Sequence, residues 1–107
     1  MKDIIFLGDS LQSIRLFPEG VKQDMGRQLF LVQRGGEPSD SKPMTSIGNG
    51  VKEIRIRAPS GAYRTIYVAT LPEAIYVLHA FQKKTQKTRK QDIDLATRRL
   101  ANLRAKQ

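Results

Sequence analysis

The side chains best suited to chemistry lie in two short segments of the chain. They form two groups at alternate positions: Glu53, Arg55 and Arg57, and then His79, Phe81 and Lys83. Isoleucines occupy the positions between the first three, and this period-two pattern predicts a strand with one buried face. Because successive side chains of a strand point to opposite faces, each group is predicted to share one face of a sheet.

These residue types indicate anion binding combined with proton transfer. Arginine keeps its proton because its pKa lies far above neutral pH, so Arg55 and Arg57 are suited to hold an anion and not to act as a base. Glu53, His79 and Lys83 are the candidates for proton transfer. Histidine in particular suits this role, since an unperturbed imidazole titrates near pH ~6.5. His79, the single histidine, could equally be a hydrogen-bonded core residue. The two arginines could pair with Glu53 or Glu73 on a solvated face.

Hydrophobic periodicity predicts the strands and helices that position these side chains. The predicted strands cover residues 3–7, 51–57, 63–69 and 74–81. The predicted helices run from Asp9 or Ser10 to Phe17, from Pro18 to the Gly35–Gly36 pair, and from Thr88 into a basic tail at about residues 104–107. Asp9 with Gln12, and Thr88 with Gln91, are predicted capping pairs. The stretch between the second helix and the next strand, residues 35–50, is predicted to be a long loop pinned to the core by Met44 and Ile47.

The apolar stripes of these helices predict how they pack. The second helix repeats its apolar residues at spacings of four, four and three: Val21, Met25, Leu29 and Val32. The last helix is predicted to face inward with Ile93, Ala96, Leu100 and Leu103 and outward with Arg98, Arg99 and Arg104. The first two helices then form a helical hairpin that must lie on a flat surface, and the tandem strand hairpins form an antiparallel sheet. The predicted fold class is α+β.

Length and composition bound the class of protein. A chain of 107 residues is predicted to be one domain, residues 1–107. The sequence has no cysteine, which excludes disulfides and thiolate metal sites, and no glycine-rich phosphate loop or metal-ligand spacing, so no cofactor and no metal are expected. No apolar run approaches the roughly 20 residues that span a bilayer, and the first ten residues turn polar too early for a signal peptide. A cytoplasmic protein without membrane contact is expected.

The formal net charge of +9 is distributed unevenly along the chain. The net charge is 0 over residues 1–50, +2 over residues 51–82 and +7 over residues 83–107. A field of this kind attracts polyanions, and nucleic acid or the ribosome is the polyanion that a cytoplasmic protein meets most often. A merely soluble basic surface is the alternative.

The order of several segments resembles one toxin family. The strands VKEIRIR, GAYRTIYVA and AIYVLHAF, the FPEG helix junction, the glycine-rich loop and the C-terminal DIDLA helix occur in the same order as in the phage-derived HigB-like branch of the RelE superfamily. The resemblance spans nearly the whole chain. It implies a RelE-like fold, in which an N-terminal helical hairpin packs on one side of a four-stranded antiparallel sheet, with a C-terminal helix and a concave basic face.

The resemblance also implies an activity and its residues. Toxins of type II toxin-antitoxin systems of this kind are endoribonucleases (mRNA interferases) that cut messenger RNA in the ribosomal A site without a metal. The 2′-hydroxyl attacks the adjacent phosphate, so the protein must remove a proton, stabilise a phosphorane and protonate the leaving oxygen. The family's strand arginine corresponds to Arg64, and its later basic residue to Lys83. The catalytic basic residues of the preceding strand correspond to Arg55 and, one step earlier, to Glu53, while Arg57 matches a neighbouring arginine. Glu53 stands where RelE itself has a basic residue, and no tyrosine follows Lys83.

Further residues and partners are expected from the same resemblance and from the basic charge. RNA contacts are predicted for six side chains: Tyr63, Phe81, Lys84, Lys87, Arg89 and Lys90. The expected partners are messenger RNA, the ribosome with its 16S rRNA, and a cognate antitoxin, for which a HigA-like helix-turn-helix protein is the first candidate. Two alternatives stay open: a ParE-like inhibitor of DNA gyrase without nuclease activity, and a non-catalytic basic RNA-binding module.

Overall fold

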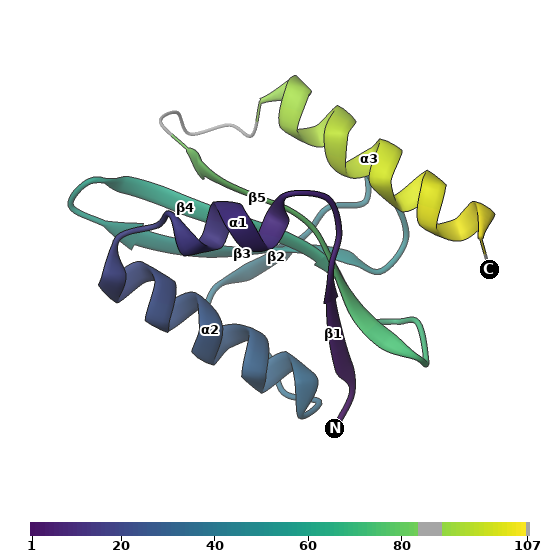
Figure 1. Ribbon diagram of the computed structural model, residues 1–107, viewed down its shortest axis with the longest axis horizontal. Helices are drawn as coiled ribbons and strands as arrows, with labels where there is room; N and C mark the ends of the chain where they lie inside the picture. The colour runs from purple at the N-terminus through teal and green to yellow at the C-terminus, as the bar shows by residue number, and fades with distance from the viewer. Residues whose placement is uncertain (84–88, 107) are drawn as a thin grey trace.

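The computed structural model describes residues 1–83 and 89–106, which form one mixed five-stranded sheet and three helices (Figure 1). The elements in chain order are β1 (Asp3–Phe6), α1 (Ser10–Arg15), α2 (Glu19–Gln33), β2 (Ser41–Pro43), β3 (Val51–Ala58), β4 (Gly61–Val68), β5 (Ala74–Lys83) and α3 (Lys90–Ala105). The strand order across the sheet is β1-β5-β4-β3-β2. β1 pairs with β5 in parallel, and the other neighbours are antiparallel. The α+β class is therefore confirmed.

The sheet differs from the expected four antiparallel strands in two places. β1 lies next to β5 and parallel to it. Along the chain, α1, α2 and three strands come between β1 and β5, and they return the chain to the end of the sheet at which β1 begins. β2 lies inside the segment predicted to be a loop and pairs with β3. Pro43 cannot donate a ladder hydrogen bond, but an edge strand tolerates proline, so three residues without a strand pattern can still pair there.

Helices cover both faces of the sheet. The back face carries α1 and α2, whose core residues Ile14, Met25 and Leu29 pack with Ile54 and Val77 of the strands. α1 contacts mainly β5 and α2 contacts β3, so the expected helical hairpin is present only as a short helix of 6 residues and a longer one of 15 residues that lie over different strands. α3 lies on the opposite face, which is called the front face from here on. In Figure 1 the back face is the one turned toward the viewer, because α1 is drawn in front of the sheet.

The front face is divided into an apolar half and a polar half. α3 covers the apolar half, where Ala96 and Leu100 pack against Val68 and Leu78 in a second buried cluster. Met44 and Ile47 belong to the same cluster, which confirms that they pin the segment between α2 and β3. The other half of the front face lies toward the β3–β4 turn and carries charged side chains. The position of α3 thus leaves the charged residues together on one half of the sheet.

Arg99 ties α3 to the rest of the fold and corrects two predictions. It was predicted to point into solvent, but its guanidinium donates to the Leu78 carbonyl and to the Asp9 carboxylate, both at 2.8 Å. Asp9 precedes α1 without capping it through its side chain. The hydrogen bond from Arg99 is the main reason why the pKa of Asp9 is lowered. Gly8 allows this approach, because a Cβ there would lie 2.4 Å from the Arg99 guanidinium.

Candidate functional site

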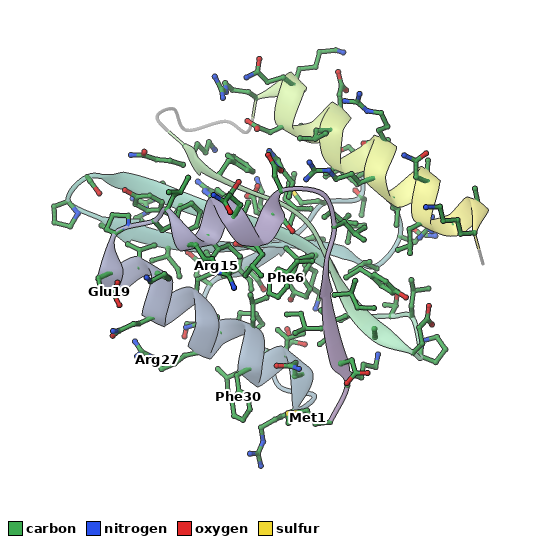
Figure 2. All side chains as sticks on the ribbon, in the orientation of Figure 1. Met1, Phe6, Arg15, Glu19, Arg27 and Phe30 are labelled. Atoms are coloured by element: carbon green, nitrogen blue, oxygen red, sulfur yellow. The ribbon has the colours of Figure 1, made fainter. Side chains whose placement is uncertain are left out.

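The strand register brings the predicted site residues together on the front face. Residues directly opposite one another in the ladder point to the same side. The ladders of β3, β4 and β5 form three rows: Glu53–Ile66–His79, Arg55–Arg64–Phe81 and Arg57–Ala62–Lys83. The prediction that each group of three shares a face is confirmed, and the two groups share the same face. Figure 2 shows the side chains on the ribbon in the orientation of Figure 1.

A β-bulge in β5 places His79 in its row. The register shifts between Ile66 and Tyr67, which pair with His79 and Val77 and leave Leu78 as the extra residue. A bulge of this kind re-aims the side chains around it. Leu78 therefore packs in the cluster beneath α3, and its neighbour His79 also lies on the front face.

A buried ion pair lies at the centre of the site. Nη1 of Arg64 donates to Oε1 of Glu53 at 2.8 Å, and the two residues are 6% and 0% exposed. Nε of Arg64 is also buried, and in the described part of the chain it has no hydrogen-bond partner. An unsatisfied buried donor of this kind costs about 1–3 kcal/mol. The guanidinium is therefore held in place by Glu53 and retains one N–H group that an added acceptor would satisfy.

Lys83 lies in the next row and is nearly fully buried, with 4% of its surface exposed. Its pKa is lowered from the usual value, first because burial disfavours the charged ammonium and then because Arg64 is nearby. Lys42 and Arg55 act in the same direction, and the Glu53 carboxylate opposes them. A buried amine among three cations and one carboxylate is an environment in which lysine releases its proton more readily.

His79 is bonded to a carboxylate from α3. Nε2 of His79 lies 2.7 Å from Oδ1 of Asp92, and the imidazole stacks on the Phe81 ring with centroids 5.0 Å apart. Oδ2 of Asp92 also accepts from Nε of Arg89 at 3.4 Å. Nδ1 of His79 is buried and, among the residues described, has no hydrogen-bond partner. Sequence reasoning missed Asp92, since nothing in the helix pattern indicates which carboxylate faces the sheet.

The exposed edge of the site lies on β3 and β2. Arg57 is exposed, whereas Arg55 donates to Oδ1 of Asp40 through Nε at 3.1 Å and Nη2 at 2.9 Å. The acidic partner of Arg55 is thus neither of the glutamates considered from the sequence. Lys42 of β2 lies opposite Glu53 in the ladder, so it points to the front face. It is an exposed cation that sequence reasoning missed, because its segment was predicted to be a loop.

The remaining predicted residues are placed differently. Tyr63 lies on the back face, where it is buried with its ring centroid 4.9 Å from that of Phe17 and its hydroxyl 2.6 Å from the Ser60 hydroxyl. It is therefore not brought together with the others. Arg89 and Lys90 lie at the start of α3, where Lys90 pairs with Asp94 at 2.8 Å. The predicted contacts Lys84 and Lys87, and the predicted cap Thr88, lie outside the described residues.

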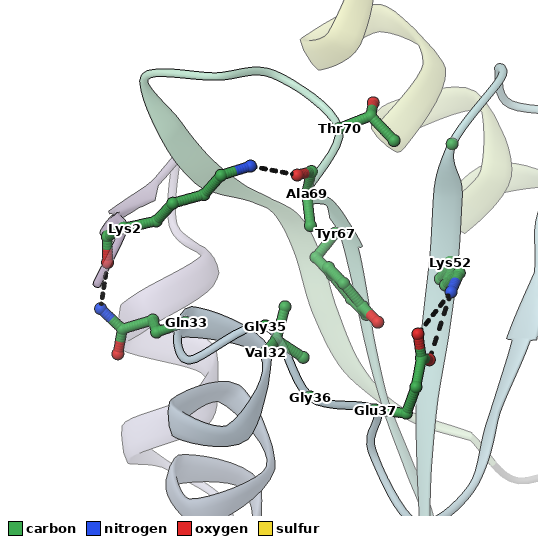
Figure 3. A pocket seen from close by; sticks show the side chains of 11 residues that line it. Lys2, Val32, Gln33, Gly35, Gly36, Glu37, Lys52, Tyr67, Ala69 and Thr70 are labelled. Carbon is green, nitrogen blue, oxygen red and sulfur yellow. Dashed lines mark hydrogen bonds and ion pairs between the residues drawn. The ribbon is translucent and has the colours of Figure 1, made fainter.

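A cavity of about 300 Å³ lies on the back side of the sheet, at the turn after α2 (Figure 3). Its lining includes the Gly35–Gly36 turn, Lys2, Tyr67 and the ion pair between Lys52 and Glu37 at 3.3 Å. None of the predicted site residues lines it. The charged cluster thus lies away from this cavity.

Tyr67 in this cavity gives a prediction for alkaline pH. Burial, and secondly the Glu37 charge, raise the pKa of Tyr67 from 10 to about 12. Its protonated form therefore contributes stability that is present below pH 10 and is lost as the pH rises through about 12. We expect the unfolding free energy of wild type to fall relative to that of Tyr67→Phe as the pH rises across this window, because phenylalanine has no proton to lose. Urea denaturation at several pH values measures the difference, and a constant difference would contradict the assignment.

Comparison with known proteins identifies one family. The family model described as "Phage derived protein Gp49-like" matches residues 12–101, which include all of the front-face cluster. No curated protein matches the chain. In residues 1–83 and 89–106, no helix is both long and apolar enough to cross a membrane, and no group of three metal-binding side chains is found.

Proposed function

Because the chain belongs to the Gp49-like family of phage-derived proteins, which is toxin-like and related to RelE/HigB-type toxins, we propose that it is the toxin of a type II toxin-antitoxin system and cleaves messenger RNA on the ribosome. The observation that carries the proposal is the cluster of Arg55, Arg64 and Lys83 around Glu53 on one face of the sheet. A cognate antitoxin, for which a HigA-like protein is the first candidate, would hold the toxin inactive.

The cluster supplies the residue types that metal-independent RNA cleavage requires. Arg64, oriented by Glu53, offers a buried N–H to a phosphate oxygen, and Arg55 adds a second guanidinium in the same row. Both stabilise the negative charge that develops on the phosphorane. Lys83 has a lowered pKa, which suits a general acid for the leaving 5′-oxygen. Glu53 and His79 are the candidates for accepting the 2′-hydroxyl proton.

Induced expression in a bacterial host with 5′-end mapping of cellular messenger RNA tests this proposal. We expect wild type to arrest growth and to cut messages within translated frames, and Arg64→Gln to lose these cuts by about 10²-fold or more, as when an oxyanion-stabilising donor is removed. Arg27→Gln is the matched control, because Arg27 is an exposed arginine on α2, on the back side. Circular dichroism and denaturation of the purified proteins check that each variant folds.

The same experiment separates the alternatives. Growth arrest with intact messages would overturn the nuclease proposal and favour a protein target such as gyrase. RNA binding without arrest and without cuts would favour a non-catalytic RNA-binding module. Cuts that persist in Arg64→Gln at the wild-type rate would show that the front-face cluster is not the active site.

A further inference from the structure

β2 extends the front face beyond the residues that sequence reasoning found. Lys42 lies opposite Glu53, so the first row of the site becomes Lys42–Glu53–Ile66–His79 across four strands. The Lys42 side chain is exposed, yet its charge is close enough to contribute to the lowered pKa of Lys83. An exposed cation beside a buried cationic cluster is suited to a polyanion that lies across the sheet and reaches into it.

Asp40, just before β2, holds the neighbouring guanidinium. Its carboxylate accepts two hydrogen bonds from Arg55, and its backbone carbonyl accepts a third from the Arg55 amide at 2.9 Å. The side chains of Arg55 and Asp40 are 34% and 48% exposed. An exposed pair of this kind contributes only about 0–1 kcal/mol, so a phosphate group can replace the carboxylate at little cost.

The back face of the same two strands carries a comparable pair. Lys52 lies opposite Pro43, one position from Glu53, and therefore points to the other side of the sheet. Its ammonium pairs with the Glu37 carboxylate at 3.3 Å, and Lys52 is about as exposed as Arg55. The two faces of the β2–β3 edge thus present the same kinds of charge within a few residues of each other.

We propose that the Asp40–Lys42 segment forms the outer wall of a binding surface for the backbone of single-stranded RNA. This inference rests on the proposed function. Lys42 binds a phosphate next to the one that Arg64 holds, and Asp40 keeps Arg55 oriented until a phosphate takes the place of the carboxylate. The contacts are to phosphates and not to base edges, so they position the RNA without reading its sequence.

Four single substitutions in the full chain test the surface. The probe is a short single-stranded RNA with 2′-O-methyl groups, which can bind but lacks the nucleophile for cleavage, and its Kd is measured by fluorescence anisotropy at several salt concentrations. We expect Lys42→Gln to weaken binding by about 3- to 10-fold and to reduce the slope of log Kd against log salt by about 0.7. Asp40→Asn is expected to tighten binding by a similar factor. The back-face controls Lys52→Gln and Glu37→Gln should each stay within about twofold of wild type.

Each outcome bears on a different statement. If Lys42→Gln and Lys52→Gln weaken binding equally, only the net charge matters and the inference is overturned, even though the protein still cuts messages. If Asp40→Asn and Glu37→Gln tighten binding equally, the role of Asp40 is overturned in the same way. If wild type neither binds the probe nor cuts messages, the proposed function fails and this inference fails with it. All four side chains are intermediate or exposed, so the variants are expected to fold.

Discussion

Replacing Lys83 by methionine is expected to lower the rate of messenger RNA cleavage by about 10²- to 10⁴-fold, the range that a general acid contributes. Methionine is an unbranched side chain of similar length, so it fills the buried position without an amine. The test is single-turnover cleavage by the purified protein on programmed ribosomes. Binding of the 2′-O-methyl RNA should change much less than the rate, because Lys83 is nearly fully buried whereas Lys42 and Arg57 are exposed.

Lys83→Arg distinguishes proton transfer from charge. Arginine restores the positive charge but does not release a proton near neutral pH, since its pKa lies far above that of lysine. If Lys83 is the acid, Lys83→Arg stays slow, and in wild type the rate falls as the pH rises through the lowered pKa of Lys83. Full activity in Lys83→Arg would reduce Lys83 to an electrostatic role. Full activity in Lys83→Met would remove it from the reaction.

The same lysine should lower the stability of the fold. Its pKa in the folded protein lies below the ordinary lysine value of 10.5, so the unfolded chain binds this proton more tightly. Stability therefore rises as the pH rises from the lowered pKa toward 10.5, and the cost of the charge is fully present below that window. Lys83→Met is expected to be at least as stable as wild type at neutral pH. A residue that lowers stability and whose loss abolishes cleavage is one retained for function.

Much of the site could be predicted because strand alternation is a local property. Isoleucines at alternate positions fix which side of β3 faces the core under α1 and α2, and this places Glu53, Arg55 and Arg57 on the other face without knowledge of the partner strands. That Glu53 is buried on this second face could not be predicted in the same way. The same rule placed His79, Phe81 and Lys83 together, although the bulge at Leu78 lies just before them. Tyr63 was included among the RNA contacts for its aromatic ring, although it directly precedes Arg64 and alternation places it on the opposite face, where it packs on Phe17.

The parts that were missed depend on contacts between distant segments. β2 forms because three residues reach an available edge of β3, and a segment containing proline gives no local signal for this. The parallel pairing of β1 likewise depends on how α1 and α2 lie over the sheet. Asp92 and Arg99 are charged residues of an amphipathic helix. Their spacing in the sequence does not indicate that Asp92 binds His79 or that Arg99 binds Asp9. These residues acquire a role only when α3 docks.

The second large effect is expected at Glu53, whose removal should destabilise the fold by about 3–5 kcal/mol, because Glu53→Ala leaves the Arg64 guanidinium buried without its counter-charge. Urea denaturation measures the loss. Asp40→Ala is the matched control, since it breaks an exposed arginine–carboxylate pair that is worth about 0–1 kcal/mol. A loss at Glu53 no larger than at Asp40 would show that the buried pair does not support the fold.

Two further variants separate the stabilising role of Glu53 from a catalytic one. The double variant Glu53→Leu/Arg64→Met removes both charges, so stability should return to within about 1–2 kcal/mol of wild type while cleavage stays absent. Glu53→Gln keeps an oxygen that can accept from Nη1 of Arg64 but cannot take a proton. If Glu53 only orients Arg64, Glu53→Gln retains a measurable fraction of the cleavage rate. If Glu53 is the base for the 2′-hydroxyl, the rate falls as far as in Glu53→Ala although the arginine is still held, and proton removal is then assigned to Glu53 and not to His79.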